Sequence, residues 1–358
     1  MQVSISNISR LFLASLFFAN TLIASALIAV RAQANADCEN QFVRVSEQVE
    51  SRFLYSHARA EGRAVYFEHL PAKRGKPTLF LLNGMFVPAT DLKAFRDAFE
   101  QKSKGEGLLI MFYSTQLESL YLRGLLGDDP ALNLKLRDGQ SLTRADLATE
   151  AVAVLKASGA KGSIFPAGYS FGSGPVVEFA SLMANQSSNQ PLPGVRIKEV
   201  VLLSPFVHAG EQVPFGASNV ESLMRLNPFL GEAAIQKMRA QSARTTAAAS
   251  IDDFILKTGG LPDGVSRETA IQSVASQIMS VMDFDLRNVT GLSVPVRFVL
   301  AQNEATLRLV AQKDAMQAMK KTSDQPVELT IVPDVNHHLL AHQPEVGADA
   351  LLTVLRGR

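Results

Sequence analysis

Apolar residues cluster in seven short segments of the chain, each with the length and composition of a β-strand. The segments at residues 79–82 and 200–203 are apolar at every position, which is typical of central strands that helices cover on both faces. The predicted strands are residues 63–70, 78–82, 107–113, 162–167, 199–203, 296–300 and 327–332.

Helical patterns fill most of the intervals between these segments. The predicted helices are residues 91–102, 143–158, 175–184, 306–321 and 345–356. Strands that alternate with helices in this way predict an α/β fold, with a mostly parallel, doubly wound sheet and helices on both of its faces.

The interval of about residues 207–291 departs from this alternation. It has no strand pattern, and it contains a capping box at residues 218–221 and a looser helix start at residues 250–253. Apolar residues also recur at helical spacing between Ile271 and Met282. We therefore predict a helical insertion that covers a site at the carboxyl edge of the sheet.

Residues 1–36 have the pattern of a targeting segment. Residues 11–30 form an uncharged apolar run that follows Arg10. The triplets at 32–34 and 34–36 each have a small residue at the first and third positions, as in a signal-peptidase site. The run is also long enough to span a bilayer, so a retained anchor that contacts the membrane is the alternative. In either case we expect residues 37–358 to be exported, in the periplasm or secreted.

The charge and the cysteine content bear on which partners the protein binds and on whether it contains disulfides. The chain has 35 Lys and Arg against 34 Asp and Glu, a net charge of +1. A nucleic-acid partner would need a basic face, so none is expected. Cys38 is the only cysteine, and no disulfide can therefore form within the chain.

A candidate nucleophile lies in the segment of residues 162–174. A predicted strand ends there in the pattern G-x-S-x-G, formed by Gly168, Ser170 and Gly172, and a helix begins at once. Such a turn exposes a strained serine hydroxyl, and the helix N-terminus directs amide groups to the place where an oxyanion would form. A glycine-rich structural turn is the alternative, but the strand before it and the helix after it favour the nucleophile.

A nucleophilic serine needs a base and an acid that orients the base. His337, in the loop after the last strand, is the candidate base, and His338 and His342 are its alternatives. Glu304 is the first carboxylate after the strand at 296–300, and a turn after a parallel strand brings its side chain to the carboxyl edge of the sheet. Asp334 is the alternative acid.

Two backbone amides are candidates for an oxyanion hole. One belongs to Phe171, the residue after the serine, and the other to Met85, because Gly84 allows the chain to turn toward the site. An ordinary Asn-Gly turn at Asn83 is the alternative. The spacing of His338 and His342 could suit a metal ion, but no H-E-x-x-H motif or carboxylate cluster accompanies them, so we expect no metal.

From about residue 63 to the C-terminus, these motifs resemble the α/β-hydrolase superfamily, in its lid-bearing branch of serine esterases and lipases. The segment at 336–344 is similar to the catalytic-histidine loop of that family. Three features differ from the family pattern: Asn83 replaces the usual His, Glu304 replaces the commoner Asp, and residues 111–116 lack the usual Asp and Gly.

The resemblance implies a serine hydrolase without a cofactor that cleaves a small-molecule carboxylic ester through an acyl-enzyme. Ser170, His337 and Glu304 would be its catalytic residues. Apolar side chains of the covering insertion would suit an apolar group on the ester: Phe206, Phe215, Leu223, Met224, Phe229, Leu230 and Phe254. Two alternatives stay open, because a fold does not determine a function. One is a non-catalytic binding module, and the other is the same triad acting on an amide, a thioester or a lactone.

Overall fold

A computed structural model describes residues 53–357, except residues 86, 126–141, 185–191, 209–231 and 262–264. All the described residues belong to one compact unit, Val49–Arg358. The targeting segment predicted at residues 1–36 and the capping box predicted at residues 218–221 lie outside the described residues.

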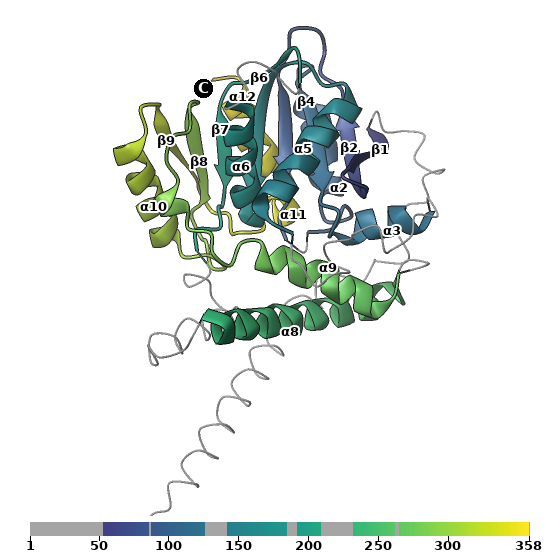
Figure 1. Cartoon of the computed structure of the whole chain (residues 1–358). Helices are drawn as coiled ribbons and strands as arrows, with labels where there is room; N and C mark the ends of the chain where they lie inside the picture. Colours follow the sequence, from purple (N-terminus) through teal and green to yellow (C-terminus); the bar gives the residue numbers. More distant parts are fainter. Residues whose placement is uncertain are drawn as a thin grey trace, which may run out of the picture. The chain divides into compact units, whose positions relative to one another are not determined.

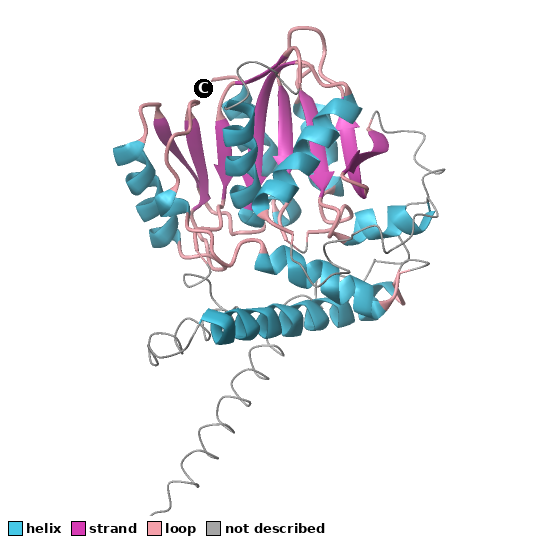
Figure 2. Cartoon of the chain, in the orientation of Figure 1, coloured by secondary structure: helices cyan, strands magenta, loops and turns pink. Residues whose placement is uncertain are grey.

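Within the described residues, nine strands form one sheet (Figures 1 and 2). The order is β1-β2-β4-β3-β5-β7-β8-β9, and the short strand β6 pairs with β5. The pairs β1–β2 and β2–β4 are antiparallel and the others are parallel. The strands are β1 (Leu54–Ala60), β2 (Arg63–Leu70), β3 (Thr78–Leu82), β4 (Gly107–Phe112), β5 (Gly162–Tyr169), β6 (Val195–Ile197), β7 (Val200–Leu203), β8 (Val296–Ala301) and β9 (Val327–Val332).

Helices cover both faces of this sheet. The side chains of β3 show why its sequence is apolar throughout: Phe80 and Leu82 join one hydrophobic cluster, and Leu79 and Leu81 join the other. The first cluster includes side chains of α5, α6 and α10, and the second includes side chains of α2, α11 and α12. The predicted doubly wound α/β fold is confirmed. The helices are α2 (Lys93–Lys102), α3 (Leu117–Leu125), α5 (Arg144–Ser158), α6 (Ser173–Ala184), α8 (Glu232–Thr258), α9 (Arg267–Met279), α10 (Leu309–Thr322), α11 (Leu339–His342) and α12 (Pro344–Leu355).

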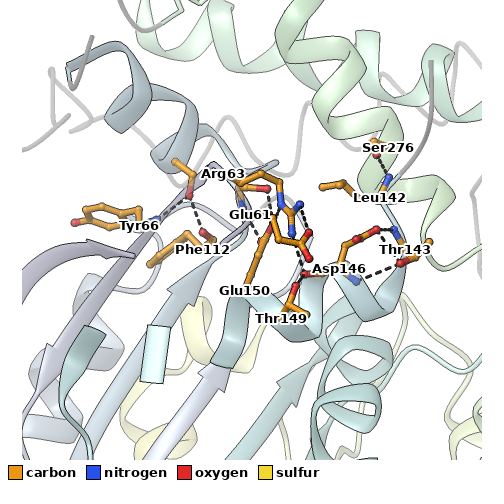
Figure 3. Close-up of polar contacts among 12 residues, drawn as sticks. Glu61, Arg63, Tyr66, Phe112, Leu142, Thr143, Asp146, Thr149, Glu150 and Ser276 are labelled. Atoms are coloured by element: carbon orange, nitrogen blue, oxygen red, sulfur yellow. Dashed lines mark hydrogen bonds and ion pairs between the residues drawn. The ribbon is translucent and has the colours of Figure 1, made fainter. Parts of the chain in front are cut away.

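The start of α5 is joined to the neighbouring strands by buried polar contacts (Figure 3). Thr143 and Asp146 form a capping box at its first turn. Glu150 accepts hydrogen bonds from the Arg63 guanidinium at 2.8 Å and from the Ser114 hydroxyl at 2.6 Å. These contacts connect α5 to β2 and to the loop that follows β4, at the carboxyl edge of the sheet.

Among the described residues of the interval at 207–291, the helices α8 and α9 pack together. Arg244 pairs with Glu268, and Arg267 pairs with Asp252, across the two helices. Figure 1 shows α9 between α8 and the ends of the strands, and the Ser276 hydroxyl of α9 accepts a hydrogen bond from the backbone N–H of Leu142 at 2.7 Å (Figure 3). Among the helices of the described region, none is both long and apolar enough to span a bilayer.

Some sequence-based expectations about elements were wrong. Residues 250–253 lie inside α8 rather than at a helix start. The Ser250 hydroxyl donates to the carbonyl of Thr246, four residues earlier, at 3.1 Å and caps no backbone N–H. The helix expected between residues 271 and 282 is present as α9 but ends at Met279. β1, β6 and α3 were not predicted; β1 is half-exposed and mixed in polarity, and β6 has only three residues.

Candidate functional site

Ser170 lies at the sharp turn between β5 and α6. A single 3-10 turn, η2 (Ser170–Gly172), separates the strand from the helix, and Ser170 has a φ of 51°, a conformation rare for residues other than glycine. A Cβ atom at Gly168 would lie 2.5 Å from the carbonyl oxygen of Gly172, and one at Gly172 would overlap the carbonyl oxygen of Leu82. Close backbone packing therefore requires both glycines, and the strand and helix expected around Ser170 are present.

Ser170, His337 and Glu304 form a chain of hydrogen bonds. Nε2 of His337 lies 2.9 Å from Oγ of Ser170, and Nδ1 of His337 lies 2.8 Å from Oε2 of Glu304. Glu304 follows β8 and His337 follows β9, and these strands are adjacent and parallel. Their loops therefore leave the sheet at the same edge as the turn after β5, which brings the three side chains together.

Backbone amides hold the Glu304 carboxylate in place. Its Oε1 accepts hydrogen bonds from the N–H groups of Thr306 and Leu307, each at 2.9 Å, which leaves Oε2 for His337. The side chain of Glu304 is fully buried, and that of His337 is only 6% exposed. A charge that develops on this pair is therefore screened little by water.

The alternatives to His337 and Glu304 lie elsewhere. The rings of His338 and His342 follow His337 in a row, with centroids 5.2 Å and 5.3 Å apart, and His337 is the histidine that contacts Ser170. Asp334 is exposed, and its backbone N–H donates to the side chain of Gln302 at 3.2 Å. Of the two candidate acids, the structure brings Glu304 to His337.

Tyr169 positions the backbone of the histidine loop, a contact that sequence reasoning missed. Its hydroxyl donates a hydrogen bond of 2.9 Å to the carbonyl oxygen of His337, and the two rings stack with centroids 5.8 Å apart. Burial raises the pKa of Tyr169, so the hydroxyl keeps its proton and remains a donor. The only sign of this role in the sequence is that Tyr169 lies between Gly168 and Ser170.

The two candidate oxyanion amides follow two adjacent parallel strands, Met85 after β3 and Phe171 after β5. The Asn83 side chain holds the loop after this strand, because Oδ1 accepts from the N–H of Gly84 at 2.8 Å and Nδ2 donates to the carbonyl of Val87 at 2.6 Å. A Cβ atom at Gly84 would lie 3.2 Å from the ring of Tyr169. The peptide between Gly84 and Met85 is therefore held close to the residue that precedes Ser170.

Phe171 carries the other candidate amide and is anchored by its side chain. The ring is buried and meets the ring of Tyr113 edge to face, with centroids 5.4 Å apart. As regards metal ions, the described part of the chain has no group of three or more His, Cys, Asp or Glu side chains that could hold one.

No protein-family model matches the sequence, and no curated protein sequence matches it. The structure, in contrast, is similar to many solved structures. One is a thermophilic esterase from Thermogutta terrifontis, with a TM-score of 0.51 and 15% identity over 85% of this chain and 98% of that chain.

Two others have comparable scores. MGS-M2, an α/β-hydrolase enzyme from a Medee basin deep-sea metagenome, has a TM-score of 0.51 and 17% identity over 85% of this chain and 98% of that chain. An enol-lactonase from Burkholderia xenovorans has a TM-score of 0.52 and 14% identity over 84% of this chain and 100% of that chain. At identities this low, the similarity is one of fold.

Proposed function

Since the chain has the α/β-hydrolase fold, we propose that it is a serine hydrolase that cleaves carboxylic esters. The fold alone does not carry this proposal, because one fold can host many functions. The observation that carries it is the continuous chain of hydrogen bonds from Ser170 through His337 to Glu304, at 2.9 Å and 2.8 Å. These are the contacts that a nucleophile, a base and an orienting acid require.

In the proposed mechanism, the Oγ of Ser170 attacks the carbonyl carbon of the ester while Nε2 of His337 takes the hydroxyl proton. The carboxylate of Glu304 accepts the Nδ1–H of the imidazolium and stabilises its charge. The carbonyl oxygen becomes an oxyanion, which the N–H groups of Met85 and Phe171 stabilise.

Collapse of this intermediate breaks the bond to the alcohol, which leaves with the proton from Nε2. The acyl group stays on Oγ of Ser170. Water then attacks the acyl-enzyme and gives its proton to His337, and the second tetrahedral intermediate releases the carboxylic acid as the proton returns to Ser170. No step needs a cofactor.

The proposed substrate is a small-molecule ester with an apolar group. The words esterase and enol-lactonase in the names of similar structures both refer to ester cleavage. Phe206 and Phe284 stack with ring centroids 6.3 Å apart, and the N–H of Phe206 donates to the carbonyl of Ser170 at 3.1 Å. The backbone of Phe206 therefore lies beside Ser170, and the two rings belong to the buried hydrophobic cluster behind it.

We also propose that the interval at 207–291 covers the site. Of the apolar residues expected to form this cover, Phe206 and Phe254 are described. The others lie outside the described residues: Phe215, Leu223, Met224, Phe229 and Leu230.

Labelling with a fluorophosphonate tests the function before any substrate is known. The wild type should take up one label, on the peptide that contains Ser170, and Ser170→Ala should take up none. Ser158→Ala is the matched control, because its hydroxyl forms local bonds at the end of α5: it donates to the carbonyl of Leu155 at 3.0 Å and accepts from the N–H of Ala160 at 3.3 Å. It should label like the wild type. A folded wild type that stays unlabelled contradicts the enzymatic proposal.

Export is a second part of the proposal, supported by the apolar run at residues 11–30 and the triplets at 32–34 and 34–36. N-terminal sequencing of the full chain, expressed with a C-terminal tag in a Gram-negative host, tests it. A new N-terminus after Ala34 or Ala36 indicates cleavage, and an intact chain in the membrane fraction indicates an anchor. An intact chain in the cytoplasm contradicts export.

A further inference from the structure

The two peptides that carry the candidate oxyanion N–H groups, those of Met85 and Phe171, are held in a similar way. Each N–H belongs to a planar peptide whose carbonyl oxygen points to the opposite side. A group that holds the carbonyl oxygen therefore also sets the direction of the N–H. In both peptides, the carbonyl oxygen is held by hydrogen bonds that lead to a buried glutamine.

The first peptide joins Gly84 and Met85. Nε2 of Gln116 donates a hydrogen bond of 2.9 Å to the carbonyl oxygen of Gly84. The same side chain is fixed at its other end, because Oε1 accepts from the N–H of Tyr113 at 2.9 Å. Gln116 is 5% exposed, so water competes little for either bond. No residue in the described part of the chain accepts a hydrogen bond from the N–H of Met85.

The second peptide joins Ser170 and Phe171. The carbonyl oxygen of Ser170 accepts hydrogen bonds from the hydroxyl of Ser173 at 2.7 Å, from the backbone N–H of Ser173 and from the N–H of Phe206 at 3.1 Å. Phe206 is in turn joined to Pro205, whose carbonyl oxygen accepts from Nε2 of Gln312 at 3.1 Å.

Gln312 thus lies one peptide further from the site than Gln116 does. It belongs to α10 and is fully buried. The turn that it holds also contains Ser204, which has a φ of 40°. Such a backbone persists only when its surroundings fix it, and the Gln312 amide is one group that does so.

We propose that Gln116 and Gln312 are positioning residues of the oxyanion hole, each of which orients one of its two amides. This inference rests on the proposed function. Donors that are already oriented cost no reorganisation when negative charge develops, which is the main advantage of such a hole. Hydrogen bonds in a chain also polarise one another, so an occupied carbonyl makes its N–H a better donor.

Gln116→Met and Gln312→Met test the inference, because methionine has a similar volume and no amide. A p-nitrophenyl ester that the wild type hydrolyses gives kcat and KM. A trifluoromethyl ketone, which forms a hemiketal oxyanion on the serine, measures binding to the hole directly. Ser280→Ala is the matched control, since it also removes a buried side-chain hydrogen bond to a carbonyl, that of Gln277 at 2.7 Å.

For Gln116→Met we expect kcat to fall by roughly 10- to 100-fold, somewhat less than the loss of a whole oxyanion donor. Gln312→Met should lose less, about 3- to 10-fold, because Ser173 still holds the carbonyl of Ser170. The affinity for the ketone should fall by the same factors, while KM and the Ser280→Ala variant stay within about two-fold of the wild type. A residue that only stabilised the fold would not produce this pattern.

Folded variants that keep the kcat and ketone affinity of a wild type labelled at Ser170 would overturn the inference and leave the proposed function intact. A rise in KM at constant kcat would overturn it as well. A folded wild type without labelling overturns the proposed function, and the inference with it. If Gln116→Met does not fold, Gln116→Ala replaces it, because alanine also removes the donor and adds neither bulk nor charge.

Discussion

Replacement of Glu304 by glutamine should change the tautomer of His337. In the wild type, both oxygens of this carboxylate are acceptors: Oε1 faces the N–H groups of Thr306 and Leu307, and Oε2 faces Nδ1 of His337. A glutamine must keep its oxygen toward the two backbone donors, so its NH2 group faces Nδ1. Nδ1 must then accept, and the ring proton moves to Nε2. An Nε2–H cannot take the proton of Ser170.

The size of the effect follows from this geometry. A triad whose acid is replaced by its amide keeps its shape but holds the wrong histidine tautomer, and in the serine-protease example such a change lowers kcat by about 10⁴-fold. The amide of Glu304→Gln fits the same buried space and satisfies the same backbone donors, so the fold should survive. We therefore expect a loss of kcat on the order of 10³- to 10⁴-fold with an unchanged melting temperature.

Steady-state hydrolysis of a p-nitrophenyl ester, with thermal unfolding followed by circular dichroism, measures both quantities. Asp334→Asn is the matched control, because Asp334 is exposed and offers its backbone, not its carboxylate, to the Gln302 side chain. It should retain wild-type activity. If Glu304→Gln stays within about ten-fold of the wild type while folded, or if Asp334→Asn loses the activity instead, the tautomer explanation is wrong.

Three further predictions concern the base, the turn and a buried acid. His337→Ala should lose ester hydrolysis and His338→Ala should keep it, as initial rates will show; the opposite result would make His338 the base. Gly172→Ala should lower the free energy of unfolding by about 1–3 kcal/mol or more, because its Cβ overlaps a backbone carbonyl. Gly260→Ala, which has open space around it, should leave the free energy of unfolding in denaturant nearly unchanged. Equal losses of stability in the two variants would contradict the packing argument. Burial raises the pKa of Glu118 from 4.5 to about 7, so the folded state binds this proton more tightly and loses stability as pH rises through that interval. Glu118→Gln should therefore gain about 2–3 kcal/mol relative to the wild type between pH 5 and pH 8 in urea unfolding, and a pH-independent difference would refute this.

The pattern of apolar residues predicted the strands that are buried on both faces, but not the half-exposed strand β1 at the edge of the sheet. The all-apolar run of β3 indicated a strand buried on both faces, and its residues do enter two separate clusters. β1 carries no such signal, because half of its positions face solvent and it forms by pairing with β2. The interior of α8 carries a misleading signal, since the Ser and Asp residues at 250–253 resemble an N-terminal cap but lie well inside the helix.

The candidate site shows the same division between local and non-local information. The turn at Ser170 could be recognised because its strand, glycines and helix are consecutive in the sequence. The order of the strands allowed Glu304 and His337 to be selected, since each follows a parallel strand. The roles of Tyr169 and Gln116 could not be predicted, because each depends on a hydrogen bond to a carbonyl oxygen far away in the chain.

The central claim is that Ser170 forms a covalent acyl-enzyme. Rapid-quench mass spectrometry of the wild type mixed with p-nitrophenyl acetate tests this most directly. The account predicts that one acetyl group appears on the peptide containing Ser170 before steady-state turnover, that its formation is accompanied by a burst of p-nitrophenol, and that Ser170→Ala shows neither. A folded protein that hydrolyses the ester without acetylation of Ser170, or that is acetylated at another residue, would contradict the account.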